Sequence, residues 1–277
     1  MLVIKCGGAA GLDTAAICAD IAARAGSGEQ MVLVHGGSKE ANDLGERLSH
    51  PARFLTSPSG VQSRYTDAAT LDVLTMAMAG RINPALVSRL IGLGVRAVGL
   101  SGVDGALVQA RRKPANRAVV DGRVRVIHDD LTGKIAGVNA GLLRLLLDGG
   151  YVPVVSPPAL DPVAGPLNVD ADRMAAAIAA ALQAECLVIL SNVPGLLRDP
   201  ADPSSLVTTV PPRGMPGCLG LAHGRMKLKL IAAREALCGG VGRVILGDGR
   251  LEAPIQKALA GRGTVLGPEA LDEGGGT

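Results

Sequence analysis

Residues 2 to 37 decide the fold, and they read LVIKCGGAAGLDTAAICADIAARAGSGEQMVLVHGG. Two short apolar runs, residues 2–5 and 31–34, each lead into a glycine pair, a pattern typical of buried parallel strands. Between them Asp13 can cap a helix that has one apolar face and ends at Gly26. The segment therefore predicts a strand, a crossover helix and a second, parallel strand.

The same alternation continues along the chain. We expect buried strands at residues 95–100, 152–155, 186–190 and 244–246, and helices at residues 38–48, 68–79, 84–92, 138–147, 171–182 and 226–237. Two exposed hairpins are expected, within 54–67 and from the charged runs 106–111 and 117–127, and a frayed tail at 273–277. The pattern predicts an α/β fold, an open, mostly parallel sheet sandwiched between helices, in two lobes formed by residues 1–170 and 171–277.

The composition excludes several classes of protein. Of the 277 residues, 48% are hydrophobic and 19% charged, which is enough for a core and not typical of disorder. The longest strongly apolar stretch, residues 174–182, falls short of the roughly 20 residues that a membrane span needs. A net charge of +3 and three aromatic residues do not fit a nucleic-acid-binding surface.

The five cysteines show neither metal-ligand spacing nor a disulfide pattern, and the N-terminus has no secretory signal. We therefore expect a cytoplasmic protein without a metal site made of its own side chains.

Three glycine turns follow predicted strands, at residues 5–8, 35–38 and 100–102. In an open α/β sheet, ligands bind at the carboxyl ends of the strands, and glycine lets backbone amides approach an anion closely. Two or three such turns predict a cradle for a phosphate or a carboxylate, although one alone is also what an ordinary tight turn looks like. Neither a P-loop nor a GxGxxG fingerprint is present, which disfavours P-loop NTPases and dinucleotide dehydrogenases.

Charged residues stand at three of the predicted element ends. Lys5 ends a buried strand, where an unpaired ammonium would be costly, so it needs an anion. Lys229 follows Gly224 on the first turns of a helix, and the alternative for it is a solvated surface lysine. Asp172 opens the alanine-rich helix, where it could serve only as a cap.

Two further polar residues are candidates. Arg64 follows the first hairpin and can grip a carboxylate with both arms of its guanidinium, the alternative being a surface ion pair with Asp67. His35 stands beside the glycines, but no serine or cysteine motif accompanies it, so we assign it a packing role.

Taken together, these motifs resemble those of the amino-acid kinase superfamily, and within it the acetylglutamate kinase family, over nearly the whole chain. The resemblance rests on the order and spacing of VIKCGG (3–8), VHGG (34–37), RYTD (64–67), GRIN (80–83), GLSGVDG (99–105), NVDAD (168–172), LSNVPG (190–195) and GRMKLK (224–229). It implies an N-terminal lobe that binds the acylated amino acid and forms a homodimer, and a C-terminal lobe that binds ATP with Mg²⁺.

The resemblance also implies roles for individual residues. A catalytic group would hold the transferring phosphoryl group, with Asp172 orienting the two lysines: Lys5, Lys229, Asp172, Gly8 and Gly37. A second group would bind the acceptor, with Arg64 on its α-carboxylate and Asn168 on its acylamino region: Gly36, Gly37, Arg64 and Asn168. A third group would border the nucleotide: Ser191, Asn192, Val193 and Gly195.

The sequence departs from the acetylglutamate kinase pattern at two motifs. Those kinases usually show HGGGP and NxNxD, whereas Ser38 and Lys39 replace the third glycine and the proline here, and Asp170 replaces the second asparagine. This pattern is more similar to kinases whose aminoadipate or glutamate substrate is attached through its amino group to a small acidic carrier protein of the LysW type. The basic residues 111–113 and Arg117 are then candidates for carrier docking, with a solvated hairpin as the alternative.

The expected activity is therefore ATP-dependent phosphorylation of a carrier-linked aminoadipate or glutamate carboxylate, in lysine or arginine biosynthesis. One alternative is an N-acetylglutamate kinase that acts on the free acetylated amino acid. A second is a non-catalytic nucleotide-binding sensor, against which the retention of Lys5, Asp172 and Lys229 argues. Arginine-inhibited relatives carry an extra helix before the first strand, which begins at Leu2 here, so we expect a homodimer without that feedback.

Overall fold

The structure is a computed structural model that describes residues 1–8, 11–58, 60, 62–120 and 123–271. The predicted tail at residues 273–277 lies outside this range. The strands are β1 (Leu2–Cys6), β2 (Met31–His35), β3 (Phe54–Thr56), β4 (Gln62–Arg64), β5 (Ala97–Gly102), β6 (Val108–Arg112), β7 (Asn116–Val120), β8 (Arg123–Ile127), β9 (Gly133–Val138), β10 (Val152–Asp161), β11 (Gly165–Leu167), β12 (Cys186–Ser191), β13 (Arg243–Asp248) and β14 (Thr264–Leu266).

The α-helices are α1 (Thr14–Gly26), α2 (Ser38–Arg47), α3 (Ala68–Thr75), α4 (Asn83–Gly92), α5 (Ala140–Asp148), α6 (Ala171–Leu182), α7 (Met215–Leu221), α8 (Gly224–Cys238) and α9 (Pro254–Leu259). A π-helical segment, Met76–Ile82, joins α3 to α4, and short 3-10 turns occur at Asp104–Ala106, Pro203–Ser205 and Pro268–Ala270. None of the described helices is long and apolar enough to cross a membrane.

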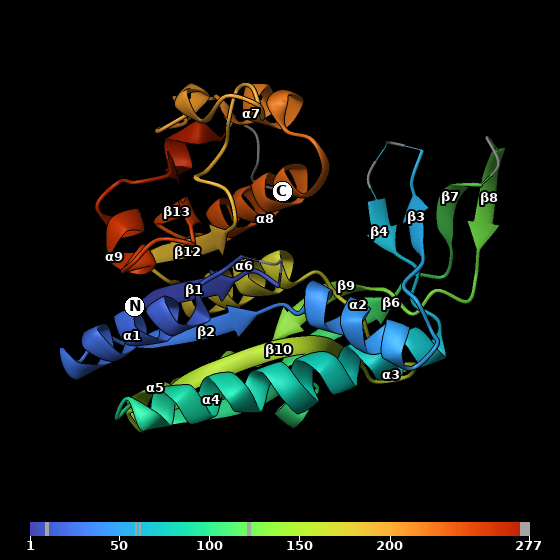
Figure 1. Ribbon diagram of the computed structural model, residues 1–277, viewed down its shortest axis with the longest axis horizontal. Helices are drawn as coiled ribbons and strands as arrows, with labels where there is room; N and C mark the ends of the chain where they lie inside the picture. The colour runs from blue at the N-terminus through green and yellow to red at the C-terminus, as the bar shows by residue number, and fades with distance from the viewer. Residues whose placement is uncertain (9–10, 59, 61, 121–122, 272–277) are drawn as a thin grey trace.

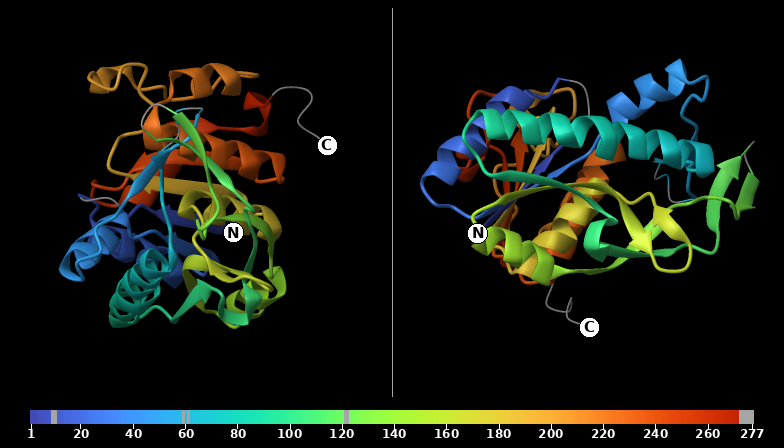
Figure 2. Two further views of the ribbon diagram at one scale, coloured as in Figure 1. Left: turned by 90° about the vertical axis from the view of Figure 1, so that its right-hand side faces the viewer. Right: turned by 90° about the horizontal axis from the view of Figure 1, so that it is seen from below.

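The main sheet runs in the order β14-β13-β12-β1-β2-β10-β6-β9, with β5 and β11 also paired to β10. Its central pairs, from β13 through β12, β1 and β2 to β10, are parallel. Helices cover both faces (Figures 1 and 2). The predicted fold class is confirmed, while the lobe boundary at residue 170 stays a prediction because one sheet runs through both halves.

The two faces of strand β1 pack against different helices. Val3 points into one core with residues of α5, α6 and α8, whereas Leu2 and Ile4 point into the other with residues of α1 and α4. This alternation follows from the two-residue period of a strand. Because Lys5 lies on the same face as Val3, it is directed toward α6 and α8.

The predicted hairpin from residues 106–111 and 117–127 is wrong. Strand β6 instead joins the main sheet, where it pairs with β9 and β10 and buries Val108 and Ala110 while Arg111 and Arg112 stay exposed. Strands β7 and β8 form the actual hairpin, and with β3 and β4 they make a separate four-stranded sheet that projects from the body (Figure 1). We call this sheet the arm.

Three predicted helices also differ from the structure. Residues 68–92 form one continuous helical rod rather than two helices, because the π-helical segment Met76–Ile82 joins α3 to α4 directly before Pro84. The helix expected from residue 138 begins at Ala140, since Gly133–Val138 is strand β9 and Asn139 caps α5 by accepting from the Leu142 amide.

Candidate active site

The central strands end side by side at one edge of the sheet. Lys5 of β1 is in register with Val34 of β2 and Ile189 of β12, so their following turns meet. A Cβ atom on Gly8 would lie 2.3 Å from the Gly37 nitrogen, so only glycine lets the two turns approach this closely. A cleft of about 860 Å³ opens over this edge.

The cleft gathers all the residues to which the resemblance assigns a catalytic, acceptor-binding or nucleotide-binding role. They are Lys5, Gly8, Gly36, Gly37, Arg64, Asn168, Asp172, Ser191, Asn192, Val193, Gly195 and Lys229. The third glycine turn is not among the described lining residues. It follows β5, which is separated from β2 by β10, and Gly102 packs against the backbone of Pro158 and Ala159.

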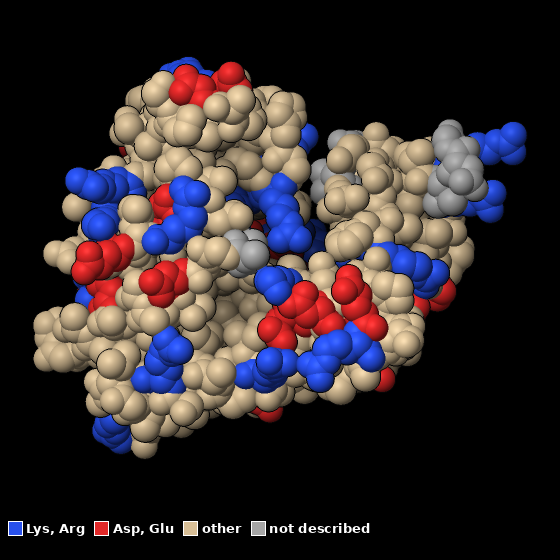
Figure 3. Space-filling model, in the orientation of Figure 1, with Lys and Arg blue, Asp and Glu red and all other residues tan. Residues whose placement is uncertain are grey.

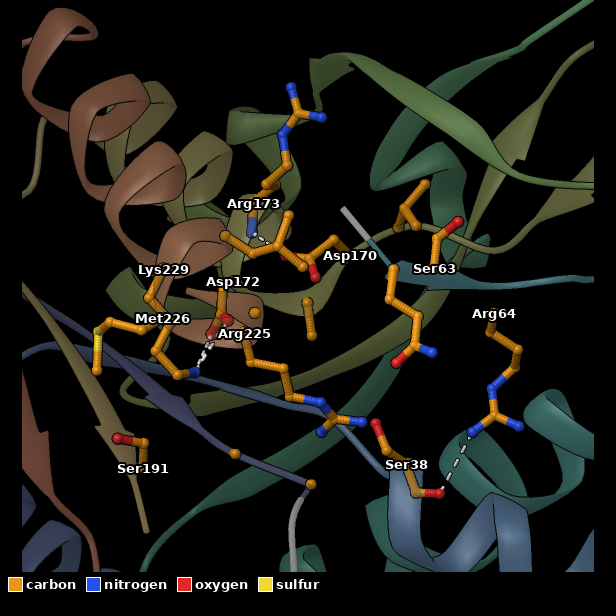
Figure 4. A pocket seen from close by; sticks show the side chains of 18 of the residues that line it. Ser38, Ser63, Arg64, Asp170, Asp172, Arg173, Ser191, Arg225, Met226 and Lys229 are labelled. Atoms are coloured by element: carbon orange, nitrogen blue, oxygen red, sulfur yellow. Dashed lines mark hydrogen bonds and ion pairs between the residues drawn. The ribbon is translucent and has the colours of Figure 1, made fainter. Parts of the chain in front are cut away.

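A lysine–aspartate–lysine triad lies in this cleft, with all three side chains almost fully buried. The Lys5 Nζ lies 2.6 Å from Asp172 Oδ1, and the Lys229 Nζ lies 3.0 Å from Asp172 Oδ2 (Figure 4). Strand β1 supplies Lys5, the first turn of α6 supplies Asp172, and α8 supplies Lys229. One carboxylate thus fixes two ammonium groups from distant parts of the chain.

The charges of the triad do not balance. Burial by itself raises the pKa of Asp172, but the two lysines outweigh burial and hold that pKa far below its usual range. Burial lowers the pKa of both lysines, and only for Lys5 does the contact with Asp172 reverse the effect and raise it. The pKa of Lys229 stays below its usual value because of burial and repulsion from Lys5. Lys229 is therefore the surplus cation of the triad.

The alternative roles considered for Lys229, Asp172 and Arg64, namely a solvated lysine, a helix cap and a surface ion pair, do not fit the structure. Lys229 is buried rather than solvated. The cap of helix α6 is Asp170, whose side chain accepts from the Arg173 amide, and not Asp172. Asp67 pairs with Arg53 and His50 rather than with Arg64.

Arg64 points into the cleft from strand β4 (Figure 4). Its Nη2 donates to the Asn42 side-chain oxygen and, at 3.5 Å, to the Ser38 carbonyl, and its guanidinium lies 5.1 Å from the centre of the Phe54 ring. Arg64 has no carboxylate partner among the described residues, so its charge is available to an anion.

Asn168 is held by a network that the sequence did not reveal. Its Nδ2 donates to the Thr66 hydroxyl at 3.0 Å, and the Thr66 amide donates to buried Asp130 at 3.2 Å. Asp130 also accepts from Asn116 Nδ2 at 2.6 Å and from the Thr132 hydroxyl at 3.3 Å. The network links the base of the arm to the part of the cleft that Asn168 lines. Its members are too far apart in the chain to form a sequence motif.

His35 takes the packing role predicted for it. Its Nδ1 donates to the Gly36 carbonyl at 2.9 Å, and its Nε2 accepts from Asn83 Nδ2 at 3.2 Å. Burial lowers the pKa of His35 to about 4, so the ring is neutral near pH 7. The ring makes one hydrogen bond through each nitrogen and so supports the turn that follows β2.

The wall formed by β12 and its following loop is built mainly from small residues and backbone. Ser191 lies at the end of β12, and its hydroxyl donates to the Val193 carbonyl at 3.4 Å. Gly195 has a positive φ of 154°, and a Cβ there would lie 2.6 Å from the Thr264 hydroxyl oxygen, so glycine is required. Glycine at this position lets the loop pack directly against Thr264.

Cations outnumber carboxylates along the cleft. Besides the triad, the described lining residues include Arg64, Lys113, Arg117, Arg173 and Arg225, and among them Asp170 is the single further carboxylate. No group of three His, Cys, Asp or Glu side chains that could hold a metal ion occurs within the part of the chain that is described. The chemistry of the cleft is thus that of an anion-binding site.

The comparison with protein families agrees with this chemistry. The profile of the Amino acid kinase family matches residues 1–248 of the 277 residues. The chain belongs to this family.

Relatives that match over most of the chain include kinases named for a LysW-linked substrate and acetylglutamate kinases. The LysW-aminoadipate kinase of Deinococcus radiodurans is 51% identical over 266 residues, which cover 96% of this chain and 91% of that protein. The LysW-aminoadipate kinase of Thermus thermophilus is 47% identical, covering 96% and 100%. An acetylglutamate kinase of Symbiobacterium thermophilum is 38% identical, covering 90% and 84%.

Solved structures share the fold at lower identity. The smu.665 protein of Streptococcus mutans superposes with a TM-score of 0.76 at 22% identity and covers 96% of this chain and 98% of its own. Carbamate kinase from Giardia lamblia superposes with a TM-score of 0.66 at 16% identity, covering 96% and 97%. The fold is therefore that of known amino-acid kinase structures.

Proposed function

We propose that this protein is an ATP-dependent kinase that phosphorylates the side-chain carboxylate of 2-aminoadipate linked to a LysW-type carrier protein, in lysine biosynthesis. The observation that carries the reaction type is the buried Lys5–Asp172–Lys229 triad at the meeting point of the glycine turns. The carrier-linked acceptor is supported by the relatives at 51% and 47% identity, which are named LysW-aminoadipate kinase.

In this mechanism an oxygen of the acceptor carboxylate attacks the γ-phosphorus of ATP while the bond to the β-phosphate oxygen breaks and ADP leaves. The reaction needs positioning and charge neutralisation rather than a covalent nucleophile. Lys5 and Lys229 neutralise the transferring phosphoryl group, Asp172 holds both ammonium groups in place, and the amides of Gly8 and Gly37 lie beside them. Because these groups are buried, their electrostatic interactions with the phosphoryl group are strong, and their positions are fixed before the reaction begins.

The acceptor and the nucleotide occupy opposite sides of the cleft in this proposal. Residues 1–170 bind the acceptor through Gly36, Arg64 and Asn168, and residues 171–277 bind ATP along the loop Ser191, Asn192, Val193 and Gly195. Mg²⁺ fits as an ion carried by the nucleotide phosphates, where it neutralises their charge, because both oxygens of Asp172 are already engaged by lysines. The enzyme acts in the cytoplasm, where its five free thiols stay reduced.

The carrier, which we take to be acidic, docks on the arm. Lys113 and Arg117 line the mouth of the cleft, and Arg117, Arg123 and Arg125 are exposed along β7 and β8. Figure 3 shows basic side chains at the tip of the projecting arm and in the hollow beside it. Of the docking residues expected from the sequence, Arg111 and Arg112 lie on β6 of the main sheet, so the arm takes their place.

A charge reversal tests this docking surface. Replacing Arg123 and Arg125 by Glu should lower kcat/KM for the carrier conjugate and weaken its dependence on salt, because long-range attraction steers an acidic partner. The matched control reverses Lys257 and Arg262, near α9 at the other end of the molecule, and should change neither. Equal effects of the two double variants would refute docking on the arm.

The protein also forms a homodimer in this proposal. Three large apolar side chains, Ile91, Leu93 and Leu145, are 47 to 70% exposed near the ends of α4 and α5. Burying such a surface is a reason for association. Sedimentation of the full-length enzyme would give the oligomeric state, and a monomer at micromolar concentration would contradict it.

An acceptor comparison tests the activity itself. The full-length enzyme is given ATP with the carrier conjugates of aminoadipate and of glutamate or with free N-acetylglutamate, and acyl phosphate is trapped with hydroxylamine. We expect the aminoadipate conjugate to react best and the glutamate conjugate about 10- to 100-fold less well, since one methylene is worth about 1 to 3 kcal/mol. A preference for N-acetylglutamate would establish the acetylglutamate kinase alternative. If no acceptor gave acyl phosphate, the non-catalytic nucleotide-binding sensor would be the remaining alternative.

A further inference from the structure

An arginine that none of the roles above uses points into the active-site cleft. Arg225 lies on the first turn of α8, one residue after Gly224, and its exposed side chain lines the cleft. It forms no ion pair or hydrogen bond within the described residues, whereas nearby Arg173 is bound by both carboxylate oxygens of Glu235. The charge of Arg225 is therefore not compensated by an ion pair or hydrogen bond from any described residue.

The direction of the Arg225 side chain limits the ligands that it can bind. Figure 4 shows Arg225 reaching away from the Asp172–Lys229 pair and across the cleft toward Ser38. Arg64 approaches Ser38 from the other side, where its Nη2 donates to the Ser38 carbonyl at 3.5 Å. Burial lowers the pKa of Arg64, and the nearby positive charge of Arg225 lowers it further. Two guanidinium groups thus face each other across Ser38 with no carboxylate between them in the described residues.

We propose that Arg225 is a second ligand of the acceptor's α-carboxylate, which it shares with Arg64. This inference rests on the proposed function and adds a substrate-binding residue to it. A carboxylate has about four lone-pair sites, enough to accept from two guanidinium groups, and its charge cancels their mutual repulsion. The Ser38 hydroxyl lies between the two arginines and supplies a further donor.

The phosphoryl group is the competing ligand, and the arrangement of cations disfavours it. Lys5 and Lys229 already supply two ammonium groups at Asp172, and Arg225 reaches toward the arginine of the acceptor wall rather than toward them. Arg225 and Lys229 are four residues apart, one turn of the same helix. A carboxylate held by both β4 and α8 would therefore also fix the position of Lys229 relative to the acceptor.

Binding measurements alone test the role of Arg225, in a thermodynamic cycle that combines protein variants with ligand variants. Isothermal calorimetry on the full-length enzyme compares the carrier conjugate of aminoadipate with the same conjugate bearing an α-carboxamide. The same pair of ligands is prepared on N-acetylglutamate, so the result does not depend on which acceptor the enzyme turns over. Arg225→Met removes the charge, and Lys227→Met removes an equal charge from the same helix at a residue that is not among the described cleft-lining residues.

Arg225→Met should raise the dissociation constant of the α-carboxylate ligand about 10- to 100-fold, the range for a charge-assisted hydrogen bond. The α-carboxamide ligand should bind wild type and Arg225→Met equally, and Lys227→Met should behave as wild type toward both ligands. A loss of affinity for a non-hydrolysable ATP analogue with unchanged acceptor binding would overturn the proposal in favour of a phosphate ligand. Equal losses for the carboxylate and the carboxamide would overturn it as well. Absence of acyl phosphate formation would refute the proposed function. The binding result could still be interpreted, because it does not depend on turnover.

Discussion

The surplus charge of the triad makes a prediction in which activity and stability change independently. In Lys229→Met, the ammonium is replaced by an uncharged side chain of similar length at a site that is only 8% exposed. The variant keeps the 2.6 Å pair between Lys5 and Asp172, which leaves the aspartate compensated. What disappears is the second cation for the transferring phosphoryl group.

The structure sets the size of both effects. Attraction between Lys229 and Asp172 at 3.0 Å is on the order of 5 kcal/mol at an effective dielectric constant of about 20. Burial and repulsion from Lys5 outweigh it, since the pKa of Lys229 is lowered. The free energy of unfolding at pH 7 should therefore be unchanged or higher by up to about 2 kcal/mol in Lys229→Met. Turnover should fall about 100-fold or more, or roughly 2.7 kcal/mol of transition-state stabilisation.

Urea unfolding and steady-state kinetics measure the two quantities, and pH provides a second check. Between the lowered pKa of Lys229 and its ordinary value of 10.5, the unfolded chain binds more protons than the folded protein. The wild-type free energy of unfolding should rise with pH through that window, and Lys229→Met should lack this rise. Asp172→Asn is the control, because it strands two buried ammonium groups and should lose about 3 kcal/mol of stability. Near-normal turnover of Lys229→Met would refute the assignment.

Three further predictions concern residues around the triad. Arg64→Lys should raise the KM for the acceptor far more than the KM for ATP, because a point charge cannot reproduce a two-pronged contact, and equal changes would make Arg64 structural. The pKa of His35 drops from 6.5 to about 4 on folding, so stability should fall as pH decreases through that window, and His35→Gln should reduce the fall in acid unfolding curves. Asp130→Asn should lower the free energy of unfolding by about 2 kcal/mol and raise the acceptor KM, because Thr66 and Asn168 lose their support; an unchanged KM would uncouple the network from the site.

The sequence predicts those parts of the fold and the site that depend on residues close together in the chain. The runs at residues 2–5 and 31–34 are apolar throughout because both faces of a parallel sheet are covered, and glycine marks where each strand must turn. Parallel strands end at one edge, so residues after different strands meet without any further information. This is why Lys5, Gly37 and Ser191 line the same cleft.

The parts that could not be predicted depend on contacts between distant segments. The sequence of strand β6 predicts a solvent-facing hairpin, because it contains two arginines. In the structure only Val108 and Ala110 form its buried face. Asp130 stands in a charged stretch, and its burial follows from partners on β7, just before β9 and just after β4. Arg225 sits beside Lys229 in the sequence, yet its direction toward Ser38 becomes visible only when α8 is placed over the cleft.

The distribution of positive charge also separates a kinase from a nucleotide sensor. A sensor needs cations only where the nucleotide phosphates lie. Here Arg64, Lys113 and Arg117 line the wall that comes from residues 1–170, across the cleft from the loop at Ser191. Holding these groups near one another raises the energy of the empty protein, since like charges repel in a partly buried site. An anionic acceptor relieves this repulsion at the same time as ATP relieves that of the triad, and two negatively charged reactants can then approach each other closely enough to react.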